Sequence, residues 1–209
     1  YATFDDRIRK AGGWLRARGV GRGDVVAVLM KNSSAFLELV FAVSHIGAVL
    51  LPINYRLSAD EVGYIVGNAG ARILIADDEL ASIAPGNAPV VLLDEAAQAS
   101  ITHLAPDAAP ARMQPVQPDD LMRLMYTSGT TDRPKGVMLT YGNLYWKSAD
   151  QTIVLGLNAD TRLLVVGPLY HVGALDLPGI SVLWHGGMLS VQRNFEPEQA
   201  LEAIEKDRL

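Results

Sequence analysis

The 209-residue sequence contains no cysteine at all. A chain without thiols has no disulfide framework, no cysteine nucleophile and no cysteine-based metal site. Positive charge is also scarce, because 18 Lys and Arg residues stand against 23 Asp and Glu residues and the formal net charge is −5. This balance argues against nucleic acid as the main partner.

Long uninterrupted apolar runs are missing as well. The stretch 35–51 is broken by four residues, Glu38, Ser44, His45 and Gly47. It therefore predicts a buried helix followed by a strand, and not a transmembrane segment. No signal peptide is recognisable and Tyr1 is not a natural start, so we expect the chain to begin inside a longer, cytoplasmic protein. With 49% hydrophobic residues it can bury a substantial core.

Helical and strand patterns alternate along the chain. Helices are expected at 3–18, 33–46, 58–70, 141–155 and 174–184 and from Pro197 onward, and strands at 25–30, 48–53, 72–76, 90–93, 121–126, 162–166 and 188–192. Capping boxes are expected at Thr3 with Asp6 and at Ser58 with Glu61. This order predicts an α/β fold with mostly parallel sheets and flanking helices, which binds ligands at the carboxyl ends of its strands.

The stretch 94–120 is rich in Ala, Pro, Gln and Asp. It predicts a surface connection between two α/β portions.

Residues 126–137 read Y-T-S-G-T-T-D-R-P-K-G-V and follow an apolar strand. Hydroxyls and backbone N–H groups donate to phosphate oxygens, glycines let the backbone approach, and a lysine adds a mobile positive charge. An ordinary Ser/Thr/Gly turn is the plainer alternative. A kinase-type or GTPase-type phosphate loop is excluded, because Pro134 and Gly136 replace the glycine and the hydroxyl that it needs.

This run resembles the T-S-G-T-T-G-x-P-K-G loop of the adenylate-forming superfamily, which includes acyl-CoA synthetases, aryl-CoA ligases, luciferases and peptide-synthetase adenylation domains. Asp132 departs from the usual glycine. The segment Gly19–Asn54 and the segment P-L-Y-H-V-G at 168–173 resemble acyl-CoA synthetases too. The resemblance therefore covers nearly the whole chain. It implies that residues 1–209 are an incomplete N-terminal AMP-binding domain and that the C-terminal domain of the family is absent from this sequence.

Site residues follow from the residue types and from this resemblance. The residues expected to bind the ATP phosphates are Thr127, Ser128, Gly129, Thr130, Thr131 and Lys135, and those expected to be catalytic are Lys135, Thr130 and His171. The resemblance implies that Tyr170, His171 and Gly173 contact the acid substrate. Arg193 could meet a phosphate of coenzyme A, although a solvated arginine is the commoner situation. No residue is assigned to bind a metal directly.

The resemblance implies an ATP-dependent carboxylic acid–CoA ligase that acts on a fatty or aromatic acid through an acyl-adenylate, with ATP, Mg²⁺ and coenzyme A. Its partners would then be small molecules, and a homodimer is compatible with this interpretation. Two alternatives stay open. One is an adenylating domain that loads a carrier protein, and the other is a non-catalytic nucleotide-binding module, which is suggested by Asp132 in place of the usual glycine. Because the family's catalytic lysine lies in its C-terminal domain, residues 1–209 alone are expected to be inactive.

Overall fold

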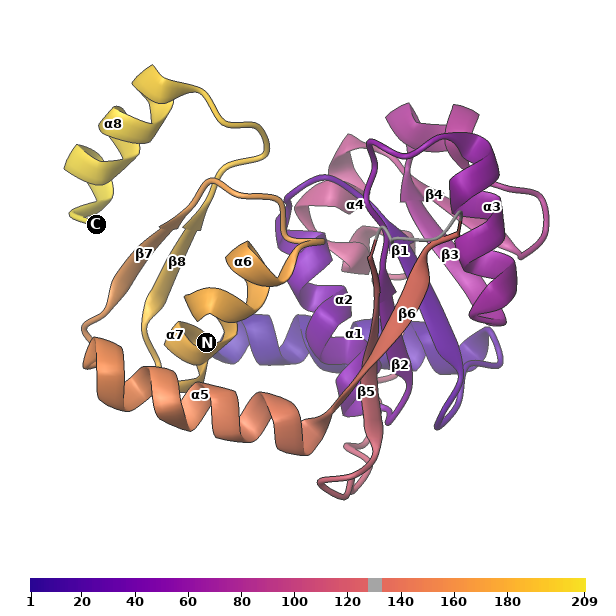
Figure 1. The fold of residues 1–209 in the computed structure, drawn as a ribbon, viewed down its shortest axis with the longest axis horizontal. Coiled ribbons are helices and arrows are strands. Elements are labelled where there is room, and N and C mark those ends of the chain that lie inside the picture. The colour runs from indigo at the N-terminus through magenta and orange to yellow at the C-terminus, as the bar shows by residue number, and fades with distance from the viewer. Residues whose placement is uncertain (128–132) are drawn as a thin grey trace. The chain divides into compact units, whose positions relative to one another are not determined.

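The computed structural model describes residues 1–127 and 133–209, which form two compact units (Figure 1). The first unit contains Tyr1–Met30 and Ser34–Tyr141. The second contains Lys31–Ser33 and Gly142–Leu209.

The first unit is built on one mostly parallel sheet. Among the described residues its strand order is β4-β3-β1-β2-β5-β6, with β1 (Val25–Leu29), β2 (Val49–Pro52), β3 (Ala71–Asp77), β4 (Val90–Leu93), β5 (Leu121–Thr127) and β6 (Lys135–Thr140). Strands β1 to β5 are parallel to their neighbours, and β6 pairs with β5 antiparallel at the edge. The predicted fold class is thus confirmed. Strand β6 was not predicted, although the apolar run at 137–139 is a signal for it.

Helices cover this sheet through apolar faces. The helices are α1 (Ala2–Ala17), α2 (Ser34–His45), α3 (Ala59–Asn68) and α4 (Glu95–Ala99), with the 3₁₀ helices η1 (Asp78–Ile83) and η2 (Ile101–Leu104). Helix α3 packs Val62, Ile65 and Val66 against Leu29 and Leu51 of the sheet. The capping box of Ser58 and Glu61 opens α3 as predicted. The capping box predicted at Thr3 is wrong, because α1 already begins at Ala2 and places Thr3 inside the helix.

The second unit is built on the parallel strand pair β7 (Arg162–Val165) and β8 (Met188–Val191). Its helices are α5 (Tyr141–Leu155), α6 (Val172–Ala174), α7 (Ile180–Trp184) and α8 (Pro197–Asp207), with the π-helical turn η3 (Leu175–Gly179). The prediction of one continuous helix over 174–184 is wrong, because Leu177 and Pro178 have non-helical backbone angles. A proline inside a helix removes a hydrogen bond and clashes with the preceding turn.

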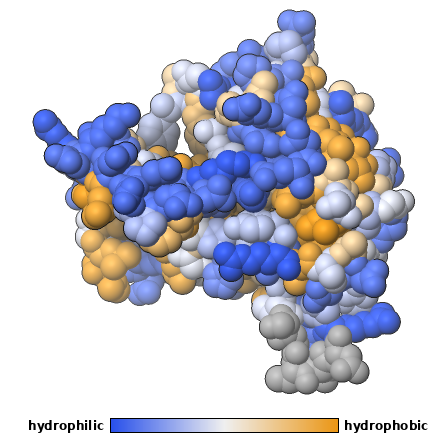
Figure 2. Space-filling model, turned by 90° about the horizontal axis from the view of Figure 1, so that it is seen from above, coloured by the Kyte–Doolittle hydropathy of each residue, from blue (hydrophilic) through white to orange (hydrophobic). Residues whose placement is uncertain are grey.

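Apolar side chains reach the surface in several patches between hydrophilic ones (Figure 2). In the first unit, Val137 and Met138 of the edge strand β6 are exposed. In the second unit, α5 exposes Trp146, Ile153 and Val154. None of the helices formed by the described residues is both long and apolar enough to cross a membrane.

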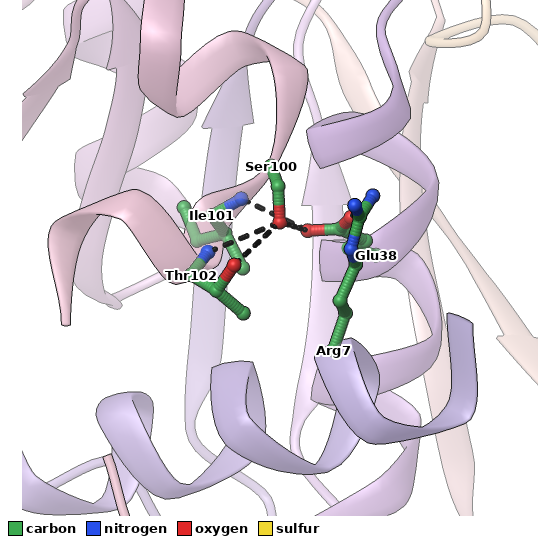
Figure 3. Close-up of polar contacts among 5 residues, drawn as sticks. All are labelled: Arg7, Glu38, Ser100, Ile101 and Thr102. Carbon is green, nitrogen blue, oxygen red and sulfur yellow. Dashed lines mark hydrogen bonds and ion pairs between the residues drawn. The ribbon is translucent and has the colours of Figure 1, made fainter. Parts of the chain in front are cut away.

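The connection between β4 and β5 is anchored to α2 by a buried carboxylate. Glu38, which is fully buried, accepts hydrogen bonds from the Ser100 hydroxyl at 3.0 Å and from the Ile101 N–H at 2.9 Å (Figure 3). The Arg7 guanidinium lies 3.5 Å from its other oxygen. Burial raises the pKa of Glu38, and these three contacts lower it by less. Part of the segment 94–120 is thus packed into the unit, since Ser100 and Ile101 are buried.

Candidate functional site

Thr127 and Lys135 close a hairpin between β5 and β6. They are paired opposite each other at the last residue of β5 and the first of β6, and both are exposed. Because β5 is parallel to β2, the hairpin leaves the sheet at the carboxyl ends of the parallel strands, where this class of sheet binds ligands. A hydroxyl and an ammonium group are therefore available as donors at its base. The predicted phosphate-binding residues Ser128, Gly129, Thr130 and Thr131, and Asp132, lie outside the described residues.

Helix α3 holds both sides of this hairpin. The Tyr126 hydroxyl donates to Asn68 Oδ1 at 2.6 Å, and the Arg133 guanidinium lies 5.0 Å from the centre of the Tyr64 ring. Tyr64 and Asn68 are four residues apart and so share one face of the helix. Sequence reasoning missed both residues, because nothing local in the sequence links α3 to the hairpin.

Gly136 makes room for an aromatic ring across the hairpin. It is paired with Tyr126, and a Cβ atom added at Gly136 would lie 3.1 Å from the Tyr126 ring. Burial raises the pKa of Tyr126, and the neighbouring Tyr64 adds to the rise. This glycine therefore serves to pack Tyr126 against the strand.

The second unit contains an apolar cavity of about 310 Å³ at the carboxyl end of β7. Its lining consists of Leu163, Leu164 and Val165 of β7, of the residues that follow the strand, Val166, Gly167, Pro168, His171 and Gly173, and of Ala174, Leu177 and Pro178. Pockets for small molecules typically occupy about 300–1,000 Å³ and combine apolar walls with a few polar groups. Here the imidazole of His171 is such a polar group.

His171 is oriented by its neighbour Gly173. The Gly173 N–H donates to His171 Nδ1 at 3.0 Å, so that His171 caps α6. A neutral imidazole that accepts at Nδ1 carries its hydrogen on Nε2, which makes Nε2–H a donor. A Cβ atom added at Gly173 would lie 3.1 Å from Nδ1, so glycine permits this contact. The structure thus brings His171 and Gly173 together. Tyr170 is half-buried beside them and is not among the residues that line the cavity.

The chain matches the family described as AMP-binding enzyme over residues 1–209. The chain belongs to the AMP-binding enzyme family. It is 39% identical over 216 residues to a feruloyl-CoA synthase from an Amycolatopsis species, a match that covers 100% of this chain and 42% of that protein. It is 36% identical over 204 residues to a 2-succinylbenzoate–CoA ligase from Geobacillus sp. (strain WCH70), with 98% of this chain and 40% of that protein covered.

The fold agrees with that of solved relatives. The crystal structure of apo MatB from Rhodopseudomonas palustris superposes with a TM-score of 0.88 at 28% identity, over 98% of this chain and 42% of that one. The chain thus spans about two fifths of the length of each of these three proteins.

The remaining predicted residue of this AMP-binding chain is Arg193. It follows β8 by two residues in the second unit and is half-buried. Thr127 and Lys135 belong to the first unit, whereas Tyr170, His171, Gly173 and Arg193 belong to the second. Among the described residues, no three His, Asp or Glu side chains gather as a metal site would require.

Proposed function

We propose that the protein containing this chain is an ATP-dependent carboxylic acid–CoA ligase. The observation that carries this proposal is the alignment of essentially the whole chain with feruloyl-CoA synthase and 2-succinylbenzoate–CoA ligase. The apolar cavity beside His171 supports it, because an acid needs an apolar wall for its body and a donor for its carboxylate.

An aromatic acid is the preferred substrate class, with a fatty acid as the second choice. Both ligases named above act, by their names, on acids that contain a benzene ring. The cavity of about 310 Å³ is of a size that suits one ring with a short chain. Its walls are mainly aliphatic, with Leu163, Val165 and Leu177 among them.

In the first step, a carboxylate oxygen of the acid attacks the α-phosphorus of ATP, and the bond from that phosphorus to the bridging oxygen breaks. A carboxylic acid with a pKa of about 4 is already ionised at neutral pH, so the attack needs no general base. Catalysis then consists of aligning two anions and stabilising the charge that develops on the phosphates. We assign the Lys135 ammonium and the Thr127 hydroxyl to the leaving pyrophosphate, and His171 Nε2–H to the carboxylate.

In the second step, the sulfur of coenzyme A bonds to the acyl carbon and the thiol proton is released to solvent. The bond from that carbon to the oxygen shared with the phosphate breaks, and AMP leaves with this oxygen. In the first step, Mg²⁺ would neutralise part of the negative charge of the triphosphate. We propose that it binds to the phosphates of ATP and not to a dedicated protein site. Mg²⁺ is commonly bound through substrate phosphates with only one or two protein carboxylates.

The full-length protein tests this proposal directly. We expect ATP–pyrophosphate exchange that depends on an added acid, followed by thioester formation when coenzyme A is supplied. A panel that pairs aromatic acids with fatty acids of similar volume identifies the class. Exchange without thioester would instead support an enzyme that loads a carrier protein, and no exchange with any acid would support a non-catalytic module.

Lys135→Ala tests the assignment to the phosphates. Charge-assisted hydrogen bonds contribute about 1.5–3 kcal/mol, which corresponds to roughly a tenfold to hundredfold loss of exchange rate. Lys206→Ala is the matched control, because Lys206 is an exposed lysine near the end of α8. Equal rates in the two variants would remove the phosphate role of Lys135.

Asp132→Gly separates the enzyme from the non-catalytic alternative. If the Asp132 carboxylate points to solvent, repulsion of one phosphate charge about 8 Å away is about 0.5 kcal/mol in bulk water. The KM for ATP should then fall only a few-fold in the glycine variant. Activity that appears only in the glycine variant would support the non-catalytic module.

A further inference from the structure

Asn32 is a buried amide whose hydrogen-bonding groups are all used within the second unit. The residue is only 5% exposed. Its Nδ2 group donates to the carbonyl oxygens of Gly167 at 2.8 Å and Gln192 at 3.0 Å. Its Oδ1 accepts from the N–H of Leu169 at 2.7 Å. One carboxamide thus supplies two donors and one acceptor to three backbone groups.

These three backbone groups lie where both strands of the small sheet end. Gly167 follows β7, Gln192 follows β8, and the Gln192 N–H continues the strand pairing by donating to Val165 at 3.0 Å. Leu169, whose N–H is held by Asn32, is 1% exposed and lies two residues before His171. The His171 N–H in turn donates to the Pro168 carbonyl at 3.0 Å.

The same turn lines the apolar cavity. Gly167, Pro168 and His171 all line it, and the bonds to Asn32 fall on Gly167 and Leu169. A shift of this turn would therefore move a wall of the cavity together with the imidazole. Neither aspartate nor alanine can replace these bonds, because aspartate would place acceptors against two carbonyl oxygens and alanine would leave all three groups unpaired.

We propose that Asn32 is a positioning residue for the acid pocket, which holds the turn 167–171 so that His171 Nε2–H meets the substrate carboxylate. This inference rests on the proposed function. Misplacement of a binding group by about 1 Å can lower a rate by roughly a hundredfold. Asn32 therefore controls the use of the acid, without contacting it, and leaves the use of ATP unchanged.

Asn32→Asp in the full-length protein is the first test. We expect kcat/KM for the acid to fall at least about tenfold, mainly through KM, while KM for ATP changes less than about twofold. The ratio of variant to wild-type activity should rise as the pH is lowered, because the introduced aspartate, once protonated, regains one donor and keeps one acceptor. Asn32→Ala should show the same loss without this recovery. Because it introduces no buried charge, it serves as the test if the aspartate variant fails to fold.

Asn158→Asp is the matched control. Asn158 is an exposed asparagine of the same unit, and its side chain bonds Gly156 and Asp160 within its own loop. Its KM for the acid and its pH profile should match the wild type. If Asn32→Ala and a folded Asn32→Asp behave like Asn158→Asp in both measurements, the positioning role is overturned.

A structural measurement keeps this inference separate from the proposed function. Nitrogen-15 NMR of histidine-labelled protein, with the His171 signals assigned through His171→Gln, reports which ring nitrogen carries the proton. Wild type should show the hydrogen on Nε2, and Asn32→Ala should shift the His171 signals toward a mixture of tautomers. If no acid supports exchange but these signals shift, only the ligase assignment fails. If exchange is normal and the signals do not move, only the positioning role fails.

Discussion

The two units of the chain differ in how completely they cover their apolar side chains. In the first unit, β2, nearly all of β1 and most of α2 are buried. In the second unit, the residues of β8 are all half-buried, and α5 leaves Trp146, Ile153 and Val154 exposed. The first unit is therefore stabilised mainly by its apolar core. In the second unit, individual polar contacts, such as those of Asn32, contribute a larger share of the stability.

The difference in burial predicts that the same substitution, phenylalanine to alanine, changes stability much more in the first unit than in the second, and this is the largest effect that we expect. Phe36 of α2 is fully buried, and Phe195, between β8 and α8, is 58% exposed. Phe36→Ala should lower the free energy of unfolding by about 3–5 kcal/mol, because a large side chain leaves a cavity in a packed core. Phe195→Ala should change it by less than about 0.5 kcal/mol. Urea unfolding of the full-length protein measures both, and equal losses would contradict the comparison.

A second prediction concerns how tightly the 94–120 segment packs on α1. A Cβ atom added at Gly13 of α1 would lie 1.8 Å from the carbonyl oxygen of Ala109, so backbone must move. Gly13→Ala should therefore cost about 1–3 kcal/mol, as overpacking does. Gly63→Ala in α3 meets only Pro85 at 3.6 Å and should be stabilising by up to about 1 kcal/mol. Thermal unfolding distinguishes these opposite signs, and a neutral Gly13→Ala would mean that the segment is loosely attached.

The sequence predicted those helices and strands whose apolar residues recur at regular helical or strand spacing. The largely apolar helix at 33–46 and the strand at 90–93 are examples, and both are found within one residue of the expected bounds. The kink was missed although Pro178 itself is a signal for it, since proline disrupts a helix interior. Strand β6 was missed because its first residues, Lys135 and Gly136, look like loop until the partner strand is known, and the apolar run at 137–139 is short.

The candidate site was predictable only where a motif carries the chemistry. Lys135 and His171 stand in short runs that can be read from neighbouring residues. Asn32, Tyr64 and Asn68 act across more than 50 residues of sequence, through contacts that no local period encodes. Their partners become visible only when the strands have been ordered into a sheet.

The third prediction uses the buried carboxylate of the well-covered unit. Burial raises the pKa of Glu38, so the folded state keeps its proton to a higher pH than the unfolded chain does. Stability is therefore lost as the pH rises from the usual glutamate value of about 4.3 through the raised pKa. Glu38→Gln, which keeps the shape and removes the charge, should match the wild type near pH 4. At pH 8 it should be the more stable by about 1 kcal/mol.

Urea unfolding between pH 4 and pH 8 measures this difference. Glu38→Ala is the contrasting variant, because it leaves the Ile101 N–H unpaired in a buried place and should be destabilising at every pH. A Glu38→Gln variant that loses stability relative to wild type as the pH rises would contradict the direction of the pKa shift.

The smallest effect is expected on the exposed face of the second unit. Ile153 of α5 is 82% exposed, so folding removes little of its side chain from water. Complete burial of an isoleucine contributes about 1.5–3 kcal/mol, of which roughly a fifth applies here. Glutamine has the higher helix propensity, by a few tenths of a kcal/mol. Ile153→Gln should therefore change the free energy of unfolding of the full-length protein by less than about 0.5 kcal/mol. Ile75→Gln in β3, where the side chain is fully buried, is the control and should cost several times more. A loss above about 2 kcal/mol for Ile153→Gln would mean that another part of the protein covers α5, and the contrast in coverage between the two units would then disappear.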